Sequence, residues 1–172
     1  MSFYSPDSKD LVGPVYAFMR NEYPPLRVRQ RDDLYAHEVL TRIPYHGILV
    51  SKSIVDGSIR GSGKYSESQR ARLYRLGVKE FFRLPDHIET LGDNGAFNYV
   101  EEKVPPVTVE ETLDFYEGCK FDAGASVDHV IFGYAPGATE STVDAEWAER
   151  RQLTLRLAQE FIEASAHRRT RM

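Results

Sequence analysis

A continuous apolar run from Ile48 to Val50, inside the segment Gly47 to Val55 (GILVSKSIV), constrains the fold of this 172-residue chain more than any other feature. Such an unbroken run is typical of a strand that is covered on both faces, as in a parallel sheet. Capping-box patterns predict two helices further along, from Ser66 to Gly77 and from Thr108 to Gly118. Strands that alternate with capped helices predict an α/β fold with a parallel sheet.

Other strands are predicted from their apolar and β-branched residues at Val78 to Leu84, Ala96 to Val100 and Ala125 to Phe132. A long last helix is predicted after the possible caps at Ser141 to Asp144. The residues expected on its inner face are Ala148, Leu155, Ala158, Ile162 and Ser165.

The length of the chain allows one hydrophobic core. Five prolines lie in residues 1–44, so we expect an irregular N-terminal arm there, packed on a domain formed by residues 45–172. Three arginines between residues 27 and 31 could contact phosphates, or they could pair with Asp32 and Asp33.

Charge and cysteine content exclude several classes of protein. The net charge is -4 and the pI is about 5.8, so there is no overall basic excess, and any contact with nucleic acid requires a local patch. The single cysteine, Cys119, cannot form an internal disulfide or a cysteine-rich zinc site, and we expect it to be a buried thiol. No signal peptide and no apolar run near the ~20 residues of a membrane span is present, so a cytoplasmic protein is expected.

A loop from Asp56 to Lys64 contains three glycines and is flanked or crossed by Lys52, Arg60 and Lys64. Its backbone N–H groups could cradle a phosphate. The loop has no Walker or dinucleotide-binding spacing, and flexibility explains the glycines equally well. An enzyme that binds phosphate in this loop is the weakest of the functional hypotheses.

The stretch from Leu91 to Pro106 holds the residues with the clearest chemical use. Gly95 and Ala96 allow a flat ligand to approach the backbone, Phe97 offers a face for stacking, and Asp93 can exchange a proton. Together they outline a purine pocket. The same residues also fit a plain turn, because Asn and Gly tolerate positive φ and Asp can cap its own backbone.

Three groups of polar residues are candidates for a common site. Lys52 with Ser53, the Asp93 turn, and Asp128 with His129 all come at or just after apolar strand residues. Active-site groups of parallel sheets lie at the carboxyl ends of the strands, so these groups are expected to converge. Asp128 equally fits a role in capping the next loop, and His129 is expected to be a structural histidine with satisfied hydrogen bonds.

The segment Asp93 to Asn98 resembles the Asp-Ser-Gly-Gly-aromatic-Gln motif of the tRNA-guanine transglycosylase superfamily. The wider context is closest to the branch that inserts 7-deazaguanine into DNA. Three other pieces carry the similarity, namely GILVSKSIV, EEKVPPVTVEETLDFY and SVDHVIF. The resemblance implies the N-terminal half of a TIM (β/α)8 barrel, since a complete barrel takes ~250 residues. A small doubly wound sheet is the alternative architecture.

The resemblance implies that the protein is an enzyme, a base-exchanging pentosyltransferase. Such an enzyme replaces guanine in nucleic acid with a 7-deazaguanine such as preQ0, and the resemblance favours DNA over tRNA as the substrate. It assigns general acid/base work to Asp93, stacking on the base to Phe97, and reading of the Watson-Crick edge to Asp128. Further substrate-binding positions are Gly95, Ala96, Asn98 and Ser126, and the expected contacts to nucleic acid are Lys52, Arg60 and Lys64. Ala96 and Asn98 depart from the motif, which has glycine and glutamine there.

In the family, the nucleophilic aspartate and the Cys/His zinc site belong to the second half of the barrel. The resemblance therefore assigns no nucleophile, metal ligand or cofactor to this chain, and exchange by the chain alone is doubtful. We expect a second polypeptide or a second copy to complete the barrel, because an open sheet exposes strand edges. The alternative is a non-catalytic module or subunit that binds a purine, nucleic acid or a partner chain.

Overall fold

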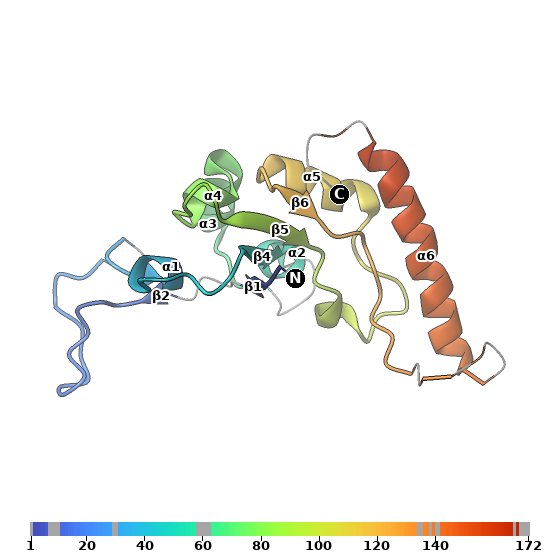
Figure 1. Cartoon of the computed structure of the whole chain (residues 1–172), viewed down its shortest axis with the longest axis horizontal. Coiled ribbons are helices and arrows are strands. Elements are labelled where there is room, and N and C mark those ends of the chain that lie inside the picture. Colours follow the sequence, from blue (N-terminus) through green and yellow to red (C-terminus); the bar gives the residue numbers. More distant parts are fainter. Residues whose placement is uncertain are drawn as a thin grey trace.

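A four-stranded parallel sheet lies at the centre of the molecule (Figure 1). The computed structural model describes residues 2–6, 11–28, 31–57, 63–133, 136–137, 139, 142–166 and 168. The strand order is β1-β4-β5-β6, with β1 at Tyr4–Pro6, β4 at Gly47–Ser51, β5 at Glu89–Asp93 and β6 at Ala123–Gly124. All three pairings are parallel, so the α/β class with parallel strands is confirmed.

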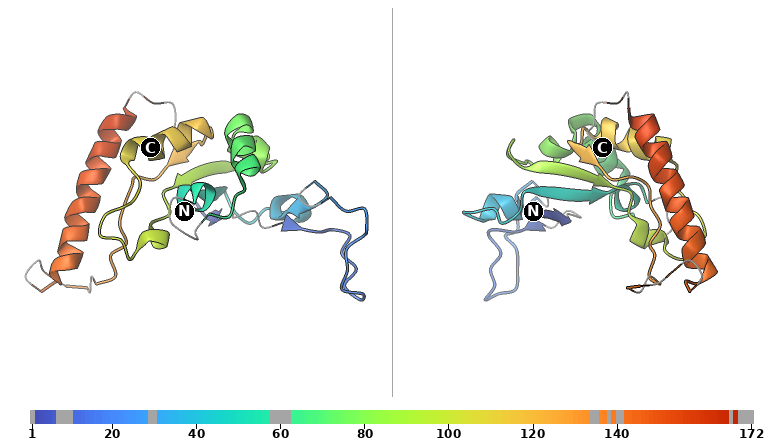
Figure 2. Two further views of the ribbon diagram at one scale, coloured as in Figure 1. Left: turned by 180° about the vertical axis from the view of Figure 1, so that it is seen from behind. Right: turned by 45° about the vertical axis from the view of Figure 1, so that its right-hand side comes forward.

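Helices connect the strands and cover the sheet. In Figure 1, α3, α4 and α5 lie above the sheet and the long α6 closes its right-hand end, while Figure 2 shows the arm projecting away from this body. The helices are α1 (Ala36–Val39), α2 (Lys52–Asp56), α3 (Glu67–Leu76), α4 (Val78–Phe81), the 3-10 helix η1 (Ala96–Tyr99), α5 (Val109–Gly118) and α6 (Ala145–Ser165).

The arm contains a two-stranded antiparallel sheet of β2 (Leu11–Val12) and β3 (Leu34–Tyr35). Arg27 forms two hydrogen bonds with Asp33, at 2.7 and 2.6 Å, and Arg31 pairs with Asp32. For these two arginines the locally paired alternative is therefore correct. Because β1 joins the central sheet, the first residues of the arm are part of the body, and the boundary at residue 44 stays a prediction.

The apolar run from Ile48 to Val50 lies in β4, where Ile48 and Val50 are each 1% exposed. The predicted strand is too long, because the chain becomes helical at Lys52. This helix, α2, turns Val55 into the core, where it is completely buried. Apolar residues after the strand thus serve the crossover and not the sheet.

The prediction of a strand at Val78 to Leu84 is wrong, because these residues begin with helix α4. Val78, Phe81 and Phe82 are buried, and their spacing fits one face of a helix as well as it fits a strand. The next strand along the chain is β5. Its buried Thr90 is satisfied by Asp122, whose carboxylate accepts from Thr90 N at 2.9 Å and from Thr90 Oγ1 at 3.0 Å.

Two more predicted strands are absent from their positions. Ala96–Tyr99 is the 3-10 helix η1, which starts beyond the left-handed Gly95. Within the segment Ala125 to Phe132, Ala125 N donates to Gly92 O at 2.9 Å, and the rest is extended coil in this described part of the chain. Side chains provide hydrogen-bond partners for the backbone of this coil. For example, His129 N donates to Thr154 Oγ1 at 3.0 Å.

Helix ends agree with the sequence better than helix faces do. Ser66 and Thr108 form the predicted capping boxes, and Asp144 caps α6. The predicted inner face of α6 is wrong in part, because Leu155 is 53% exposed and Ile162 is 66% exposed. The buried residues of this helix are Arg150 and Phe161.

Tyr116 of α5 packs across β5 and the edge strand β6 and is completely buried. Gly92 and Gly124 are register partners on β5 and β6, and both lie against the Tyr116 ring. A Cβ on Gly92 would lie 2.2 Å from the ring, and one on Gly124 would lie 2.3 Å from it. Only glycine at both positions lets the ring reach the sheet.

Cys119 is a free, buried thiol, as expected. Burial raises its pKa to about 12, so it is unreactive at neutral pH. Among the described residues, no helix combines the length and the apolar character that crossing a membrane requires.

We expect Gly92→Ala to destabilise the protein strongly, because its methyl group would overlap the Tyr116 ring at 2.2 Å. Overpacking of this kind costs about 1–3 kcal/mol in the free energy of unfolding, which urea denaturation would measure. Adding Tyr116→Leu should cost less in the Gly92→Ala background than in the wild type. Additive losses would show that the ring and the strand are not in this contact.

Candidate functional site

The carboxyl end of β5 places Asp93 beside the end of β4. Ser51, its register partner, donates from Oγ to Asp93 Oδ2 at 2.6 Å. Burial raises the pKa of Asp93 above its usual value, the hydrogen bond from Ser51 opposes this shift, and the nearby charge of Asp128 reinforces it. Asp93 is therefore a carboxyl group that holds its proton more tightly than an exposed aspartate does.

Asn94 links this strand end to the coil that carries Asp128. Its side chain is completely buried, and Nδ2 donates to Ser126 O and to Asp128 Oδ1, both at 2.8 Å. The Tyr99 hydroxyl lies within hydrogen-bonding distance of Asn94 Oδ1 and at 2.9 Å from Asp128 O. One amide thus fixes Asp128 on the same edge of the sheet as Asp93.

The turn that follows is built around Gly95, which has φ of 89°. A Cβ there would lie 1.8 Å from Ser53 Oγ, so only glycine fits this close approach. Asn98 Nδ2 donates to Ser53 Oγ at 2.7 Å, and Ser53 N donates to Asn94 O at 3.3 Å. The plain turn that the sequence suggested is therefore present, and it holds the strand end against α2.

Phe97 points away from the core and is 76% exposed, whereas the preceding Ala96 is 6% exposed. Its exposed aromatic face is available to a flat ligand. The structure places Asp93, Gly95 and Phe97 along one turn after β5, and Asn94 of this turn holds Asp128 of the neighbouring coil. Their individual roles in binding or catalysis stay predictions.

His129 is a structural residue, as expected. With its proton on Nε2, the ring donates to Glu102 O at 2.6 Å, and Nδ1 accepts from the Arg150 guanidinium at 3.1 Å. Both ring nitrogens are therefore used in joining the coil to the segment after η1 and to α6, and the residue is 2% exposed.

The three residues predicted to contact nucleic acid differ in how their charges are exposed. The prediction for Lys52 is corrected, because its side chain is 9% exposed and its ammonium group is ion-paired with Asp56 within α2. A buried, paired lysine does not present its charge to a phosphate. Lys64 is exposed at the surface. Arg60 lies outside the described residues.

Sequence reasoning missed Ser51, Asn94 and Tyr99 as parts of the site. Asn94 lies inside the motif, but an Asn-Gly pair predicts a turn and not a buried side chain with several hydrogen bonds. Tyr99 was assigned to a strand. Ser51 could have been found, because it ends β4 directly beside the register position of Asp93.

No group of three or more His, Cys, Asp or Glu side chains in the described residues could hold a metal ion. Cys119, with its buried thiol and raised pKa, also does not fit a thiolate ligand. The assignment of zinc to a region outside this chain stays a prediction.

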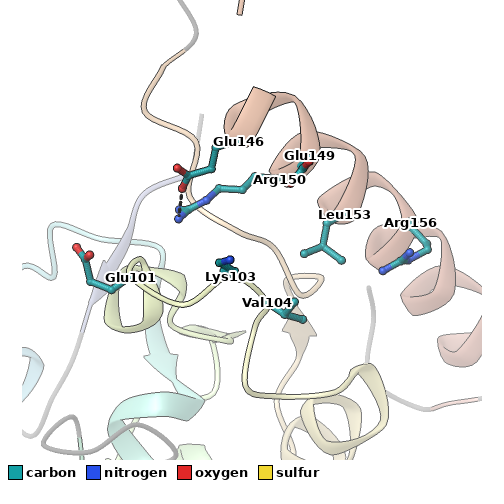
Figure 3. Close-up of a pocket in the computed structure, with 8 residues that line it drawn as sticks. All are labelled: Glu101, Lys103, Val104, Glu146, Glu149, Arg150, Leu153 and Arg156. Atoms are coloured by element: carbon teal, nitrogen blue, oxygen red, sulfur yellow. Dashed lines mark ion pairs between the residues drawn. The ribbon is translucent and has the colours of Figure 1, made fainter. Parts of the chain in front are cut away.

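A groove of about 830 Å³ lies apart from the two aspartates, between the segment after η1 and α6 (Figure 3). Lys103 and Val104 line one side, and Arg150, Leu153 and Arg156 of α6 line the other. Glu146 forms an ion pair with Arg150 at 2.7 Å, so the charges in the groove are mixed.

Sequence comparison agrees with the resemblance. The chain is 50% identical over 164 residues to a DNA-guanine transglycosylase from Salmonella montevideo, a match that covers 94% of this chain. The match covers 39% of that protein, so the chain spans well under half the length of this relative. No model of a protein family matches the chain. The chain is therefore related in sequence to part of a DNA-guanine transglycosylase.

We expect Asp93→Asn to be more stable than the wild type at neutral pH. Burial raises the pKa of Asp93 in the folded state, so its ionisation costs stability, and this cost appears as pH rises through the raised pKa. Asparagine removes the charge and keeps an acceptor for Ser51. The gain should shrink as pH falls toward the ordinary aspartate pKa of ~3.9.

Urea denaturation across this pH range measures the difference. Asp114→Asn is the matched control, because the Asp114 side chain is 70% exposed and should show little change. A loss of stability in Asp93→Asn that is the same at every pH would contradict the assignment of a raised pKa.

Proposed function

We propose that this chain, which is related to part of a DNA-guanine transglycosylase, provides the base-recognition part of an enzyme that exchanges guanine in DNA for a 7-deazaguanine. The observation that supports this most directly is the hydrogen bond from Asn94 to Asp128. Asn94 directly follows Asp93, the last residue of β5, so this bond holds Asp128 on the edge of the sheet where Asp93 lies. The exposed ring of Phe97 follows on the same turn. A carboxylate that accepts hydrogen bonds, a proton-holding carboxyl and a stacking face are what a purine site requires.

Asp128 would recognise the base. A carboxylate accepts from the ring N–H and from the exocyclic amine of a guanine-like base, which are adjacent donors on its Watson-Crick edge. Asn94 bonds to Asp128 Oδ1 and fixes the plane of the carboxylate before the ligand arrives. Such fixing lowers the entropy that binding must overcome.

Asp93 would move the proton that base exchange requires. When the bond between the sugar carbon and guanine breaks, the leaving base takes up a proton, and the incoming deazapurine must lose one to form its new bond. The raised pKa of Asp93 suits a group that gives a proton in the first step and takes one in the second. The target nucleotide has to leave the base stack to reach this edge.

The nucleophile is proposed to lie outside this chain, as is a zinc site, since the match covers 39% of the relative. A second polypeptide or a second copy would then complete the active site. The exposed apolar side chains of Leu155 and Ile162 on α6 offer a surface for such a partner.

Binding of the free base tests the proposed role of Asp128. We expect 7-cyano-7-deazaguanine to bind the chain, and Asp128→Asn to weaken its binding roughly ten- to hundred-fold, because the amide presents a donor where the base needs an acceptor. Isothermal titration calorimetry gives both affinities, and Asp114→Asn serves as the surface control. Equally weak binding by the wild type and Asp128→Asn would sink the proposal.

Exchange by the isolated chain tests the division of labour. With labelled guanine and duplex DNA, the 172-residue chain should incorporate no label, because the group that must hold the sugar carbon is outside it. Incorporation by the chain alone would place the nucleophile within these residues.

A non-catalytic binding module is the second candidate, and the hydrogen bonds that Asp93 and Asp128 make to Ser51 and Asn94 favour it, because they give both carboxylates a structural role. In that case Asp93 serves only the turn, and Asp93→Asn leaves the affinity for base, DNA and partner unchanged. Base binding that depends on Asp128 but not on Asp93 is the result that would favour this candidate.

A further inference from the structure

Three aromatic side chains form a row at the surface beside the candidate site. The rings of Phe97 on η1 and Phe132 on the coil are 6.5 Å apart, and the rings of Phe132 and Trp147 on α6 are 6.1 Å apart. Phe97 is 76% exposed and Phe132 is 62% exposed. Rings from three separate segments thus meet outside the core.

The outer part of this row is held in place by its neighbours. Phe132 meets the edge of Trp147 at 89°, and the Arg150 guanidinium lies over the Trp147 ring at 5.0 Å. Gly133 lets the indole approach closely, because a Cβ there would lie 2.0 Å from the Trp147 ring. Arg150 is itself fixed by His129 and Glu146. Phe132 is therefore supported in an exposed position.

The row is continuous with the proposed base site. Phe97 belongs to the turn that begins at Asp93, and Phe132 lies four residues after Asp128 on the same coil. Trp147 and Arg156 both belong to α6, and Lys103 and Arg156 line the groove of Figure 3. The side chain of Arg156 is 68% exposed. A strand of nucleic acid that contacts both the row and the groove would meet aromatic faces and these cations.

We propose that Phe132, supported by Trp147, stacks on the unpaired nucleobase next to the guanine in the Asp93–Asp128 site. This inference rests on the proposed function. A nucleotide that leaves the duplex deprives its neighbour of a stacking partner, and an exposed ring replaces that partner. Stacking on an aromatic ring tolerates any base, because every base has a π-face. The row therefore adds affinity for the strand without adding sequence preference.

Single-stranded DNA of about nine nucleotides with one central guanine is the probe. Fluorescence anisotropy gives the affinity, and Trp147, the single tryptophan of the chain, reports contact at the row through its own emission. A second DNA lacks the bases on both sides of the guanine. The variants are Phe132→Ala and Phe132→Leu. The leucine variant keeps an apolar side chain at this position and therefore controls for effects on folding. Phe18→Ala, which removes an exposed aromatic ring from the N-terminal arm, is the matched control.

We expect both Phe132 variants to bind the intact DNA roughly ten-fold more weakly than the wild type. The DNA without flanking bases should bind the wild type and the variants equally, because it has no base to stack. Phe18→Ala should behave as the wild type, and intact DNA should quench the emission of Trp147. RNA of the same sequence should show the same dependence on Phe132, since the ring contacts the base and not the sugar.

Equal binding of intact DNA by the wild type and the Phe132 variants would overturn the inference, as would a loss that is the same for both DNAs. Calorimetry with free 7-cyano-7-deazaguanine separates this failure from failure of the proposed function. If Asp128→Asn weakens free-base binding while the Phe132 variants bind DNA normally, the proposed base site is supported and the proposed role of Phe132 is refuted. If neither the free base nor DNA binds, both proposals fall.

Discussion

The packing of Tyr116 against two facing glycines is the contact on which the rest of the structure depends. Gly92 and Gly124 leave a flat patch across β5 and β6, and the ring covers it without contact with water. The Tyr116 hydroxyl then donates to Ala125 O at 2.9 Å, where the chain leaves the sheet. A single side chain thereby packs on two paired strands and holds the start of the coil. The residue after Gly92 is Asp93, so the same contact also fixes the floor of the candidate site.

A polar network continues where this apolar contact ends. Burial of an amide is unfavourable unless its hydrogen bonds are made, and Asn94 makes them with Ser126, Asp128 and Tyr99. Two carboxylates on one edge repel each other, which is part of the reason that the pKa of Asp93 is raised. The network holds them together despite this repulsion. A satisfied buried network specifies one arrangement, since partial loss of its partners is costly.

The sequence predicted local features well and longer-range ones less well. Ser66 and Thr108 were identified as caps because a capping box involves only neighbouring residues. Segment 78–84 was misassigned because its apolar spacing fits two structures. Strand β5 was missed because its sequence, ETLGD, has one large apolar residue, and the partner of its buried Thr90 is Asp122, about thirty residues away. The proximity of Asp93 and Asp128 was expected from the rule that strand ends converge, although Asp128 lies on the coil after β6 and not in a strand. The role of Asn94 was not expected, since its partners come from a coil that no local pattern describes.

Asp128 stands on extended coil and not within a strand, and this placement separates recognition from architecture. β6 ends at Gly124, and side-chain contacts alone hold the backbone at Asp128. A substitution at this position leaves the pairing of the four strands untouched but removes an acceptor from the buried Asn94 amide. The cost of such a change therefore falls on the polar network and not on the sheet.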